Sequence, residues 1–342
     1  MCAAIVIAMP FALSGCAASV SQAQPAETAA EVTTPETSAP GAAPSTPYAV
    51  SGYIPRAAEI DPYERWSVQD VATVFPLEGS DFELDADRVL IVKRPEAEGR
   101  TFHPVAYLIY VLNALNAYGL TGEEEYLRRA LATGEAVLEA GVRRDGALWF
   151  EYPFTFEFKG DPAETLTPPW RSGMAQGQAL SAFSRLYALT HDEKWLRGAE
   201  EVFPSLTSGP ASQKSAARVD DDGHLWFEEY LGIEPKHVVN GHIYALYGLA
   251  DYYLLTGDPR ASDLFDAGAT TIRETFDDWR VVGGLSYYCA ARYCKDAEFH
   301  PAAYHRGVTA QLVTLASMTR DERFQSQAEL LAADYRASGA TG

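Results

Sequence analysis

A short segment that carries carboxylates and phenols occurs twice in this chain. Its copies cover residues 145–152 and 222–230, and residues 283–288 resemble them more weakly. Each copy places Glu or Tyr side chains shortly before the expected start of a helix. Carboxylates and phenols transfer protons, and aromatic rings pack against sugar rings. These segments therefore predict an acid–base site that acts on a carbohydrate.

Other side chains that suit such a site precede the same expected helix starts. Arg and His groups can hold an anionic substituent, which favours a sugar that carries a carboxylate. For this carboxylate we expect Arg171, His305 and Arg306. Further expected ligand contacts are His103, Tyr152 and Trp226. For Trp226 core packing between hairpins is the alternative interpretation, and one of the neighbours Glu228 and Glu229 is expected to be a solvated or structural partner.

The elements that must position these groups follow from a second repeat. One pattern recurs four times: an apolar helix end is followed by a Thr, a short turn, an acidic residue and a new helix. The threonines, 63 to 69 residues apart, are Thr121, Thr190, Thr256 and Thr319. Such a period fits two helices, a tight turn and a longer return loop. The acidic residue is expected to cap the second helix of each pair.

The two helices of each pair differ in charge. The first helices, expected to begin at about residues 104, 173, 241 and 305, carry few charges, whereas the second ones, such as 123–140 and 193–202, carry more. Apolar inner and amphipathic outer helices predict a mainly α protein, an incomplete α/α toroid of about four helical hairpins. Because its inner helices all begin at one end, the groups that precede them should converge in one cleft.

The sequence also predicts how the chain is divided. Residues 101–342 should form the toroid, with short β hairpins at the cleft. Residues 51–100 should form a small β-containing segment, because residues 82–92 alternate like a strand. Residues 17–50 are rich in Ala, Pro and Thr and should be a disordered linker.

Residues 1–16 resemble a bacterial lipoprotein signal peptide. Their apolar run is too short to span a bilayer and ends at Cys16, which would carry the lipid. We therefore expect a lipid-anchored protein of the bacterial cell envelope, with an ordinary signal peptide as the alternative. The net charge of −20 argues against nucleic-acid binding.

Two further cysteines, Cys289 and Cys294, lie five positions apart. In an exported protein they form a local disulfide or remain two thiols, and the sequence leaves both open. The spacing of Cys and His predicts no metal site. The oligomeric state is also open, and a homodimer is one possibility.

Four motifs, in order and spacing, resemble the C-terminal helical domain of D-glucuronyl C5-epimerases. They cover residues 172–181, 226–230, 240–241 and 304–305. Members of that family invert C5 of glucuronic acid in a heparosan-type polysaccharide, which gives iduronic acid without a redox cofactor. The resemblance therefore implies an anionic uronic-acid polysaccharide as the partner and no cofactor.

The resemblance also implies roles for single residues. Glu229 would be one proton-transfer group, and Tyr304 would be its counterpart on the opposite face of the sugar ring. A further tyrosine of the family matches Tyr287, with Tyr288 as the fallback. An arginine of the animal enzymes is missing after it, and Arg292 or Arg306 is expected to substitute. The supporting contacts are Tyr230, Asn240 and Gln178.

Other activities remain open from the sequence. A polysaccharide lyase would form the same enolate and expel the substituent at C4. An inverting glycoside hydrolase would use Glu151 and Glu229, with the two carboxyl groups about 6.5–9.5 Å apart. A surface lipoprotein without catalytic activity would use the aromatic side chains to bind glycans.

Overall fold

The computed structural model describes residues 47–63, 65–66, 72–77, 82–93, 100–207 and 215–340. The predictions for residues 1–16, for Cys16 and for all but the last four residues of the linker lie outside the described residues. Within the part that is described, no helix is both long and apolar enough to cross a membrane.

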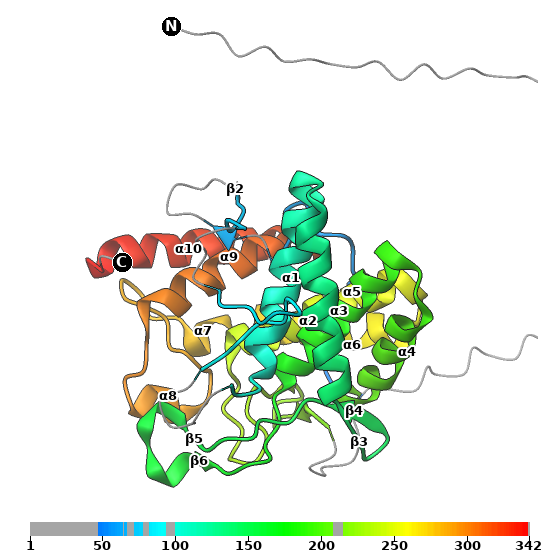
Figure 1. Cartoon of the computed structure of the whole chain (residues 1–342). Coiled ribbons are helices and arrows are strands. Elements are labelled where there is room, and N and C mark those ends of the chain that lie inside the picture. Colours follow the sequence, from blue (N-terminus) through cyan, green and yellow to red (C-terminus); the bar gives the residue numbers. More distant parts are fainter. Residues whose placement is uncertain are drawn as a thin grey trace, which may run out of the picture. The chain divides into compact units, whose positions relative to one another are not determined.

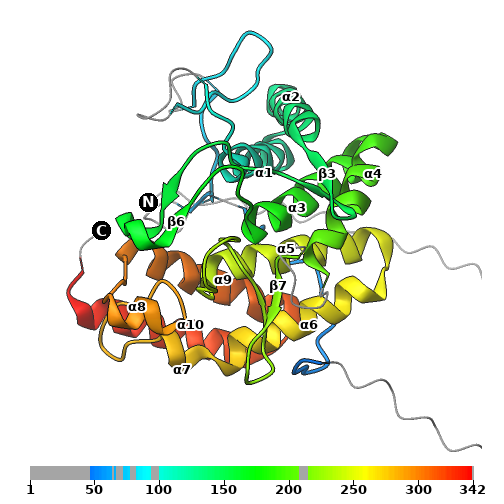
Figure 2. The ribbon, with the colours of Figure 1, turned by 90° about the horizontal axis from the view of Figure 1, so that it is seen from below.

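Four antiparallel helix pairs make up the fold (Figure 1). The inner helices are α1 (Pro104–Thr121), α3 (Gly173–Thr190), α5 (Val239–Thr256) and α9 (Ala302–Thr319). Their outer partners are α2 (Glu124–Ala140), α4 (Glu193–Val202), α6 (Pro259–Glu274) and α10 (Glu322–Ser338). The inner helices pack side by side in the order α1, α3, α5, α9, and each outer helix covers its own partner (Figure 2).

This arrangement is the incomplete α/α toroid that the sequence predicts. The four inner helices begin within three residues of the expected positions. They are apolar around most of their circumference, and thirteen of the eighteen residues of α3 are buried. Helices α3 and α5 approach closely, because a Cβ on Gly248 would lie only 3.0 Å from the Cα atom of Gly177. The tight packing of these two helices fixes the centre of the toroid.

The turn within each helix pair repeats one hydrogen-bond pattern. Thr121 Oγ1 donates to the carbonyl of Ala117 and accepts from the N–H of Glu123. The same pair of bonds recurs at Thr190, Thr256 and Thr319. The expected caps of the second helix are formed by Asp192, Asp258 and Asp321. Glu123 makes no such side-chain cap, so the predicted repeat is confirmed in three of the four turns and in the threonine bonds of all four.

Short β hairpins lie at the end where the inner helices begin (Figure 1). They are β3 (Val142–Arg144) with β4 (Ala147–Trp149), β5 (Phe156–Glu157) with β6 (Thr165–Leu166), and β7 (Ala217–Val219) with β8 (Leu225–Phe227). Asp145 and Gly146 form the turn of the first hairpin with φ angles of 55° and 79°. Two positive φ angles are typical of a two-residue hairpin turn, which Asp-Gly favours. The remaining helical segments are α7 (Phe276–Trp279), α8 (Arg292–Asp296) and the 3-10 turns Phe158–Gly160, Pro162–Glu164 and Phe203–Leu206.

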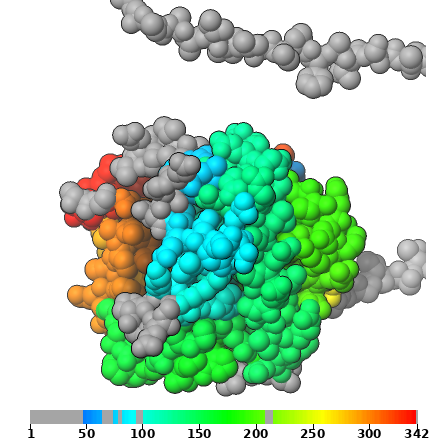
Figure 3. Space-filling model, in the orientation of Figure 1, coloured from blue at the N-terminus to red at the C-terminus, as the bar shows by residue number. Residues whose placement is uncertain are grey.

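The predicted strand over residues 82–92 is wrong. A turn at residues 85–88 divides it, and a single bridge joins Leu84 to Leu90. The cause is Asp85, whose Oδ1 accepts from the N–H groups of Asp87 and Val89 and so replaces strand hydrogen bonds. Farther back, β1 (Arg65–Trp66) pairs with β2 (Ala72–Thr73). In the view of Figure 3, the cyan surface of residues 82–93 lies between the orange surface of the α9 region and the α1–α2 pair.

An N-terminal strap, residues 48–63, runs over the toroid and contacts several of its helices. The phenol of Tyr53 donates to Asp321 at 2.5 Å, in the turn before α10. Asp61 pairs with Arg185 of α3 at 2.7 Å. The ring of Tyr63 stacks on Tyr244 of α5 at 5.9 Å. The strap therefore ties three helix pairs together, and at its start the N–H of Ala49 donates to the carbonyl of Gly223 in the turn between β7 and β8.

Candidate active site

A cavity of about 200 Å³ lies where all four inner helices begin. One residue at or near the start of each helix lines it: His103 before α1, Ser172 before α3, Asn240 in α5 and Tyr304 in α9. This is the convergence of return loops that the sequence predicts. His103 also caps α1, because its Nδ1 accepts from the N–H of Ala106 at 3.3 Å.

Aromatic rings form one wall of this cavity. Tyr152 stacks on Trp170 with ring centroids 3.8 Å apart and planes at 9°. Phe156 continues the wall, 5.8 Å from Trp170 on one side and 5.4 Å from Tyr230 on the other. Trp170 belongs to the groups before an inner helix that were expected to share the cleft, whereas Phe156 was not expected, because it lies in the return loop rather than in the repeated segment. Such a row of rings suits the apolar face of a sugar.

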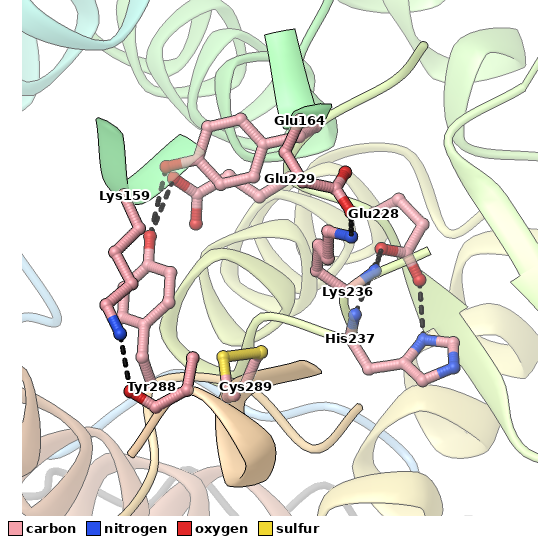
Figure 4. Close-up of a disulfide and its surroundings, with 11 residues drawn as sticks. Lys159, Glu164, Glu228, Glu229, Lys236, His237, Tyr288 and Cys289 are labelled. Carbon is pink, nitrogen blue, oxygen red and sulfur yellow. Dashed lines mark hydrogen bonds and ion pairs between the residues drawn. A yellow bond between two sulfur atoms is a disulfide. The ribbon is translucent and has the colours of Figure 1, made fainter. Parts of the chain in front are cut away.

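Glu229 is the one carboxylate among the residues that line the cavity. Its side chain is buried, with the residue 8% exposed, and its Oε1 accepts from the phenol of Tyr288 at 3.4 Å (Figure 4). Within the described residues its Oε2 has no hydrogen-bond partner. Burial raises the pKa of Glu229 to about 7, although hydrogen bonds from Tyr230 and Tyr288 oppose the rise. A carboxyl group with this pKa can accept and return a proton near neutral pH.

The neighbouring Glu228 has the opposite surroundings. It points toward His237, whose Nδ1 lies 2.6 Å from Oε1, and its Oε2 accepts from the backbone N–H groups of Lys236 and His237 (Figure 4). Burial acts to raise the pKa of Glu228, but these hydrogen bonds outweigh it and hold the pKa below its usual range. Glu228 is therefore the structural partner that the sequence analysis expected in one of the two positions.

Three phenols surround the carboxyl group of Glu229. The hydroxyls of Tyr230 and Tyr288 lie 3.0 Å apart, and the ring of Tyr304 packs edge-on against Tyr288 at 4.5 Å. Tyr304 is 40% exposed and lines the same cavity as Glu229. Burial, and then the charge of Glu229, raise the pKa of Tyr304, so its phenol is neutral at pH 7. The two predicted proton-transfer groups are thus brought into one cavity.

The loop tyrosine beside Glu229 is Tyr288, the fallback, rather than Tyr287. The ring of Tyr287 stacks on His300 with centroids 5.9 Å apart. A backbone bridge from Val238 to Cys289 makes the loop extended here, and neighbouring side chains on extended backbone point to opposite sides. The assignment of Tyr287 is therefore corrected by one residue.

The Cys289–Cys294 disulfide is formed and closes a short loop beside Tyr288 (Figure 4). On its other side Tyr288 is held by its backbone N–H, which donates to the carbonyl of Phe299 at 2.8 Å. Of the two possibilities that the sequence left open, the structure has the bridge. The bridge and the backbone bond fix the backbone from which the phenol of Tyr288 reaches Glu229.

Arg171 does not line the cavity where we expected it to hold a carboxylate. Its guanidinium pairs with Glu151 at 3.0 Å and Asp145 at 3.5 Å, and it covers the ring of Trp149 at 4.6 Å. The guanidinium of Arg171 is therefore already paired with two carboxylates of the protein. The same pairing holds Glu151 outside the cavity, so the two carboxyl groups that an inverting hydrolase needs are not assembled there.

The cavity is also not lined by His305 or Arg306, which were expected to contact the ligand. His305 is 1% exposed, accepts from the N–H of Ser286 at 2.8 Å and donates to the carbonyl of Leu331 at 2.9 Å. It fastens the loop before α8 to α9 and α10. The guanidinium of Arg306 lies over the ring of Tyr335 at 5.9 Å, on the α10 side of α9.

Three other expected ligand contacts do not line the cavity: Trp226, Gln178 and Arg292. Trp226 is 1% exposed, stacks on His237 at 4.8 Å and donates from its indole N–H to Asp220. Packing between hairpins is therefore the correct interpretation of this ring. Gln178 is fully buried in α3. Arg292 is exposed and pairs with Asp296.

Helix starts supply positive potential in place of these cations. The first turn of a helix carries unpaired N–H groups and the positive end of the helix dipole. Helices α5 and α9 begin beside the cavity without a side-chain cap, because Val238 and Pro301 precede them. Among the described residues, no three His, Cys, Asp or Glu side chains are placed to hold a metal ion.

The raised pKa of Glu229 predicts a measurable effect on stability. The folded-state pKa of about 7 exceeds the ordinary value of 4.5. The contribution of Glu229 to the free energy of unfolding is therefore fully present below pH 4.5 and is lost as the pH rises through 7. The difference corresponds to roughly 3 kcal/mol at pH 8. Glu229→Gln, which stays neutral, should therefore unfold at higher urea concentration than the wild type at pH 8 and at nearly the same concentration at pH 5. Equal wild-type and variant stabilities at pH 8 would contradict a carboxyl group destabilised by burial.

Comparisons with known proteins find one matching family. Residues 144–331 match the family described as the D-glucuronyl C5-epimerase C-terminus. An uncharacterized protein of Methanocaldococcus jannaschii is 27% identical over 209 residues, which are 58% of this chain and 64% of that protein. The D-glucuronyl C5-epimerase of Caenorhabditis elegans is 35% identical over 134 residues, which are 36% of this chain and 21% of that protein. The chain thus spans less than two thirds of the length of either relative.

Among solved structures, a family 76 α-mannanase of Bacteroides thetaiotaomicron is similar over 72% of this chain and 60% of that chain. The sequence identity is 12% and the TM-score is 0.49.

Proposed function

Because the chain belongs to the family of D-glucuronyl C5-epimerase C-terminal domains, we propose that it inverts C5 of D-glucuronic acid residues in a heparosan-like polysaccharide. The observation that carries this proposal is one cavity lined by the buried carboxyl group of Glu229, the phenol of Tyr304 and an aromatic wall. A uronic acid residue on that wall would have both groups within the same cavity.

Inversion needs one proton to leave C5 and another to arrive on the opposite face. In its ionised form Glu229 takes the proton from C5, and the electron pair of the C–H bond moves into the carboxyl group of the sugar as an enolate. The neutral phenol of Tyr304 then gives its proton to C5 from the other side. Glu229 ends protonated and Tyr304 ends as a phenolate.

Tyr288 supports the return of the proton. Its hydroxyl donates to Glu229 at 3.4 Å, and its ring contacts Tyr304 at 4.5 Å. A proton that passes from Glu229 through the phenol of Tyr288 to Tyr304 restores both groups for the next cycle, and because Tyr304 is 40% exposed, its hydroxyl exchanges with the solvent and brings deuterium to C5 in deuterated water. The hydroxyl of Tyr230, 3.0 Å from that of Tyr288, holds this relay in place.

The enolate carries more negative charge than the substrate and must be stabilised where it forms. No Arg or Lys is among the residues that line the cavity. The available donors are neutral phenols and the uncapped first turns of α5 and α9. Fixed hydrogen-bond donors in a site shielded from water stabilise a developing charge without having to reorganise.

The test is isotope exchange on uronic-acid polysaccharides. The wild-type protein is incubated with unsulfated heparosan in deuterated water, and C5 is observed by NMR. We expect deuterium at C5 and iduronic acid signals at unchanged chain length. An unsaturated C4=C5 product that absorbs ultraviolet light would identify a lyase, and new reducing ends would identify a hydrolase. If the protein binds the polysaccharide without any of these changes, its function is glycan binding and not catalysis.

A further inference from the structure

His237 has a backbone conformation that is uncommon for a residue with a side chain. Its φ angle is 54°, in the left-handed region that most side chains disfavour. The carboxylate of Glu228 holds it there, because Oε2 accepts from the N–H of His237 at 3.1 Å and Oε1 lies 2.6 Å from its Nδ1 (Figure 4). The ring of His237 also stacks on Trp226. A costly conformation that the surroundings impose indicates a constraint on the segment that contains it.

The segment around His237 forms an edge to which the loop of Tyr288 is attached. The carbonyl of His237 accepts from the N–H of Ala290 at 3.0 Å, and the N–H of Val239 donates to the carbonyl of Tyr288 at 3.5 Å. Together these are the two bonds of the antiparallel bridge that joins the two segments. A rotation of the backbone at His237 therefore moves the loop that carries the phenol of Tyr288.

The backbone is anchored on both sides of His237. Before it, the ammonium of Lys236 is buried and pairs with Glu164, just ahead of β6, at 2.6 Å. After it, α5 begins at Val239. Because neither neighbour is free to follow, a changed φ at His237 reorients mainly its own carbonyl, which is the acceptor for the N–H of Ala290.

We propose that His237 positions the phenol of Tyr288 against Glu229, through its left-handed backbone and the loop that its carbonyl holds. The inference rests on the proposed function, in which Tyr288 returns the proton from Glu229 to Tyr304. His237 is a positioning residue rather than a catalytic one, because it does not line the cavity. Glu228 in turn acts on the reaction by holding the conformation of His237.

Substitutions that differ in their tolerance of a positive φ test this role. Asn adopts the left-handed region more readily than other side chains and keeps an amide for Glu228, Ala adopts it less readily, and β-branched Val is the least suited. The kcat of C5 deuterium exchange should therefore fall in the order His237→Asn, His237→Ala, His237→Val, with KM nearly unchanged. His237→Val should lie about tenfold or more below the wild type, since a shift of about 1 Å at a reacting group costs up to about 10²-fold. Equal activities of the three variants would overturn the proposal.

His191 provides the matched control for His237. It also has a φ of 54°, but it follows α3 in the turn before α4 and does not line the cavity. His191→Val places the same side chain in the same backbone conformation, so it should lower the midpoint of urea unfolding about as much as His237→Val does. Its C5 exchange should equal that of the wild type. An equal loss of exchange in the two Val variants would point to general destabilisation and overturn the positioning role.

A second background tests whether His237 acts through Tyr288. Tyr288→Phe removes the phenol that His237 positions. In this background His237→Val should lower C5 exchange by no more than about twofold further, because two substitutions that affect one interaction are not additive. Losses that multiply as they do for independent sites would show that His237 acts on the reaction by another route.

Amide hydrogen exchange keeps this inference separate from the proposed function. The N–H of Ala290 is held by the carbonyl of His237, so its exchange reports the attachment of the Tyr288 loop. It should be about tenfold faster in His237→Val than in the wild type and in His191→Val, measured by mass spectrometry on peptides that contain residues 288–291. If the wild-type protein exchanges no C5 hydrogen, the proposed function fails, and this measurement still decides whether His237 holds the loop. Unchanged amide exchange in His237→Val would overturn the inference.

Discussion

Glu229→Gln is expected to lower C5 deuterium exchange by about 10²–10⁴-fold, the usual effect of losing a group that transfers a proton in the transition state. Gln keeps the size of the side chain and can hydrogen-bond with Tyr288, but it cannot take a proton from carbon. The loss should appear in kcat, with little change in KM, because Gln keeps the shape of the side chain and leaves the aromatic wall unchanged. Exchange is measured by NMR in deuterated water over a range of substrate concentrations.

The control for this variant is Glu234→Gln, which removes a carboxylate from an exposed position in the same return loop. It should retain wild-type exchange. The larger urea resistance expected of Glu229→Gln at pH 8 excludes misfolding as the reason for its inactivity. Exchange within about threefold of the wild type would remove Glu229 from the mechanism.

Gly241→Ala is expected to lower exchange by about 10²-fold through displacement of Glu229. A Cβ at Gly241 would lie 2.9 Å from Cβ and 3.0 Å from Cδ of Glu229, and would be closer still to Oε2. Because Glu229 is buried, its carboxyl group has little room to give way, and a shift of about 1 Å at a reacting group has an effect of this size. The absence of a side chain at Gly241 therefore positions Glu229 against the first turn of α5. The pH dependence of exchange should also move, since the displaced carboxyl group gains water and its pKa falls from about 7 toward 4.5.

Gly119→Ala is the matched control for this substitution. Gly119 lies in a helix like Gly241, but a Cβ there would meet nothing within 4 Å. Ala is favoured over Gly inside a helix by about 1 kcal/mol, so this control should be more stable and equally active. Gly241→Ala with wild-type exchange and an unchanged pH profile would show that Glu229 tolerates displacement.

The sequence predicts the helices well because their signals are local. The bonds of Thr121 and its equivalents involve residues within four positions, and apolar periodicity separates inner from outer helices. Local signals also explain the failure at residues 82–92. There the alternation of apolar residues is typical of a strand, but the side chain of Asp85 offers the backbone a turn instead.

Prediction of the site succeeded where topology alone decides position. Glu229 and Tyr304 line one cavity because the segment after β8 and the start of α9 lie at the same end of the toroid. It failed where a distant partner decides orientation: Arg171 turns to Glu151, and His305 turns to Leu331. The sequence places Tyr287 and Tyr288 equally near the site, and only the pairing of Val238 with Cys289 determines which of them faces it.

The disulfide between Cys289 and Cys294 makes the environment of the protein part of its chemistry. Where thiols are kept reduced, the chain would still form its helix pairs, since their hydrogen bonds do not involve this bridge. The backbone that carries the relay tyrosine would lose its covalent tether on one side. Protein produced in a reducing cytoplasm should therefore be folded, with the loop of Tyr288 held less firmly, and oxidation of the two thiols is the step that tethers this loop.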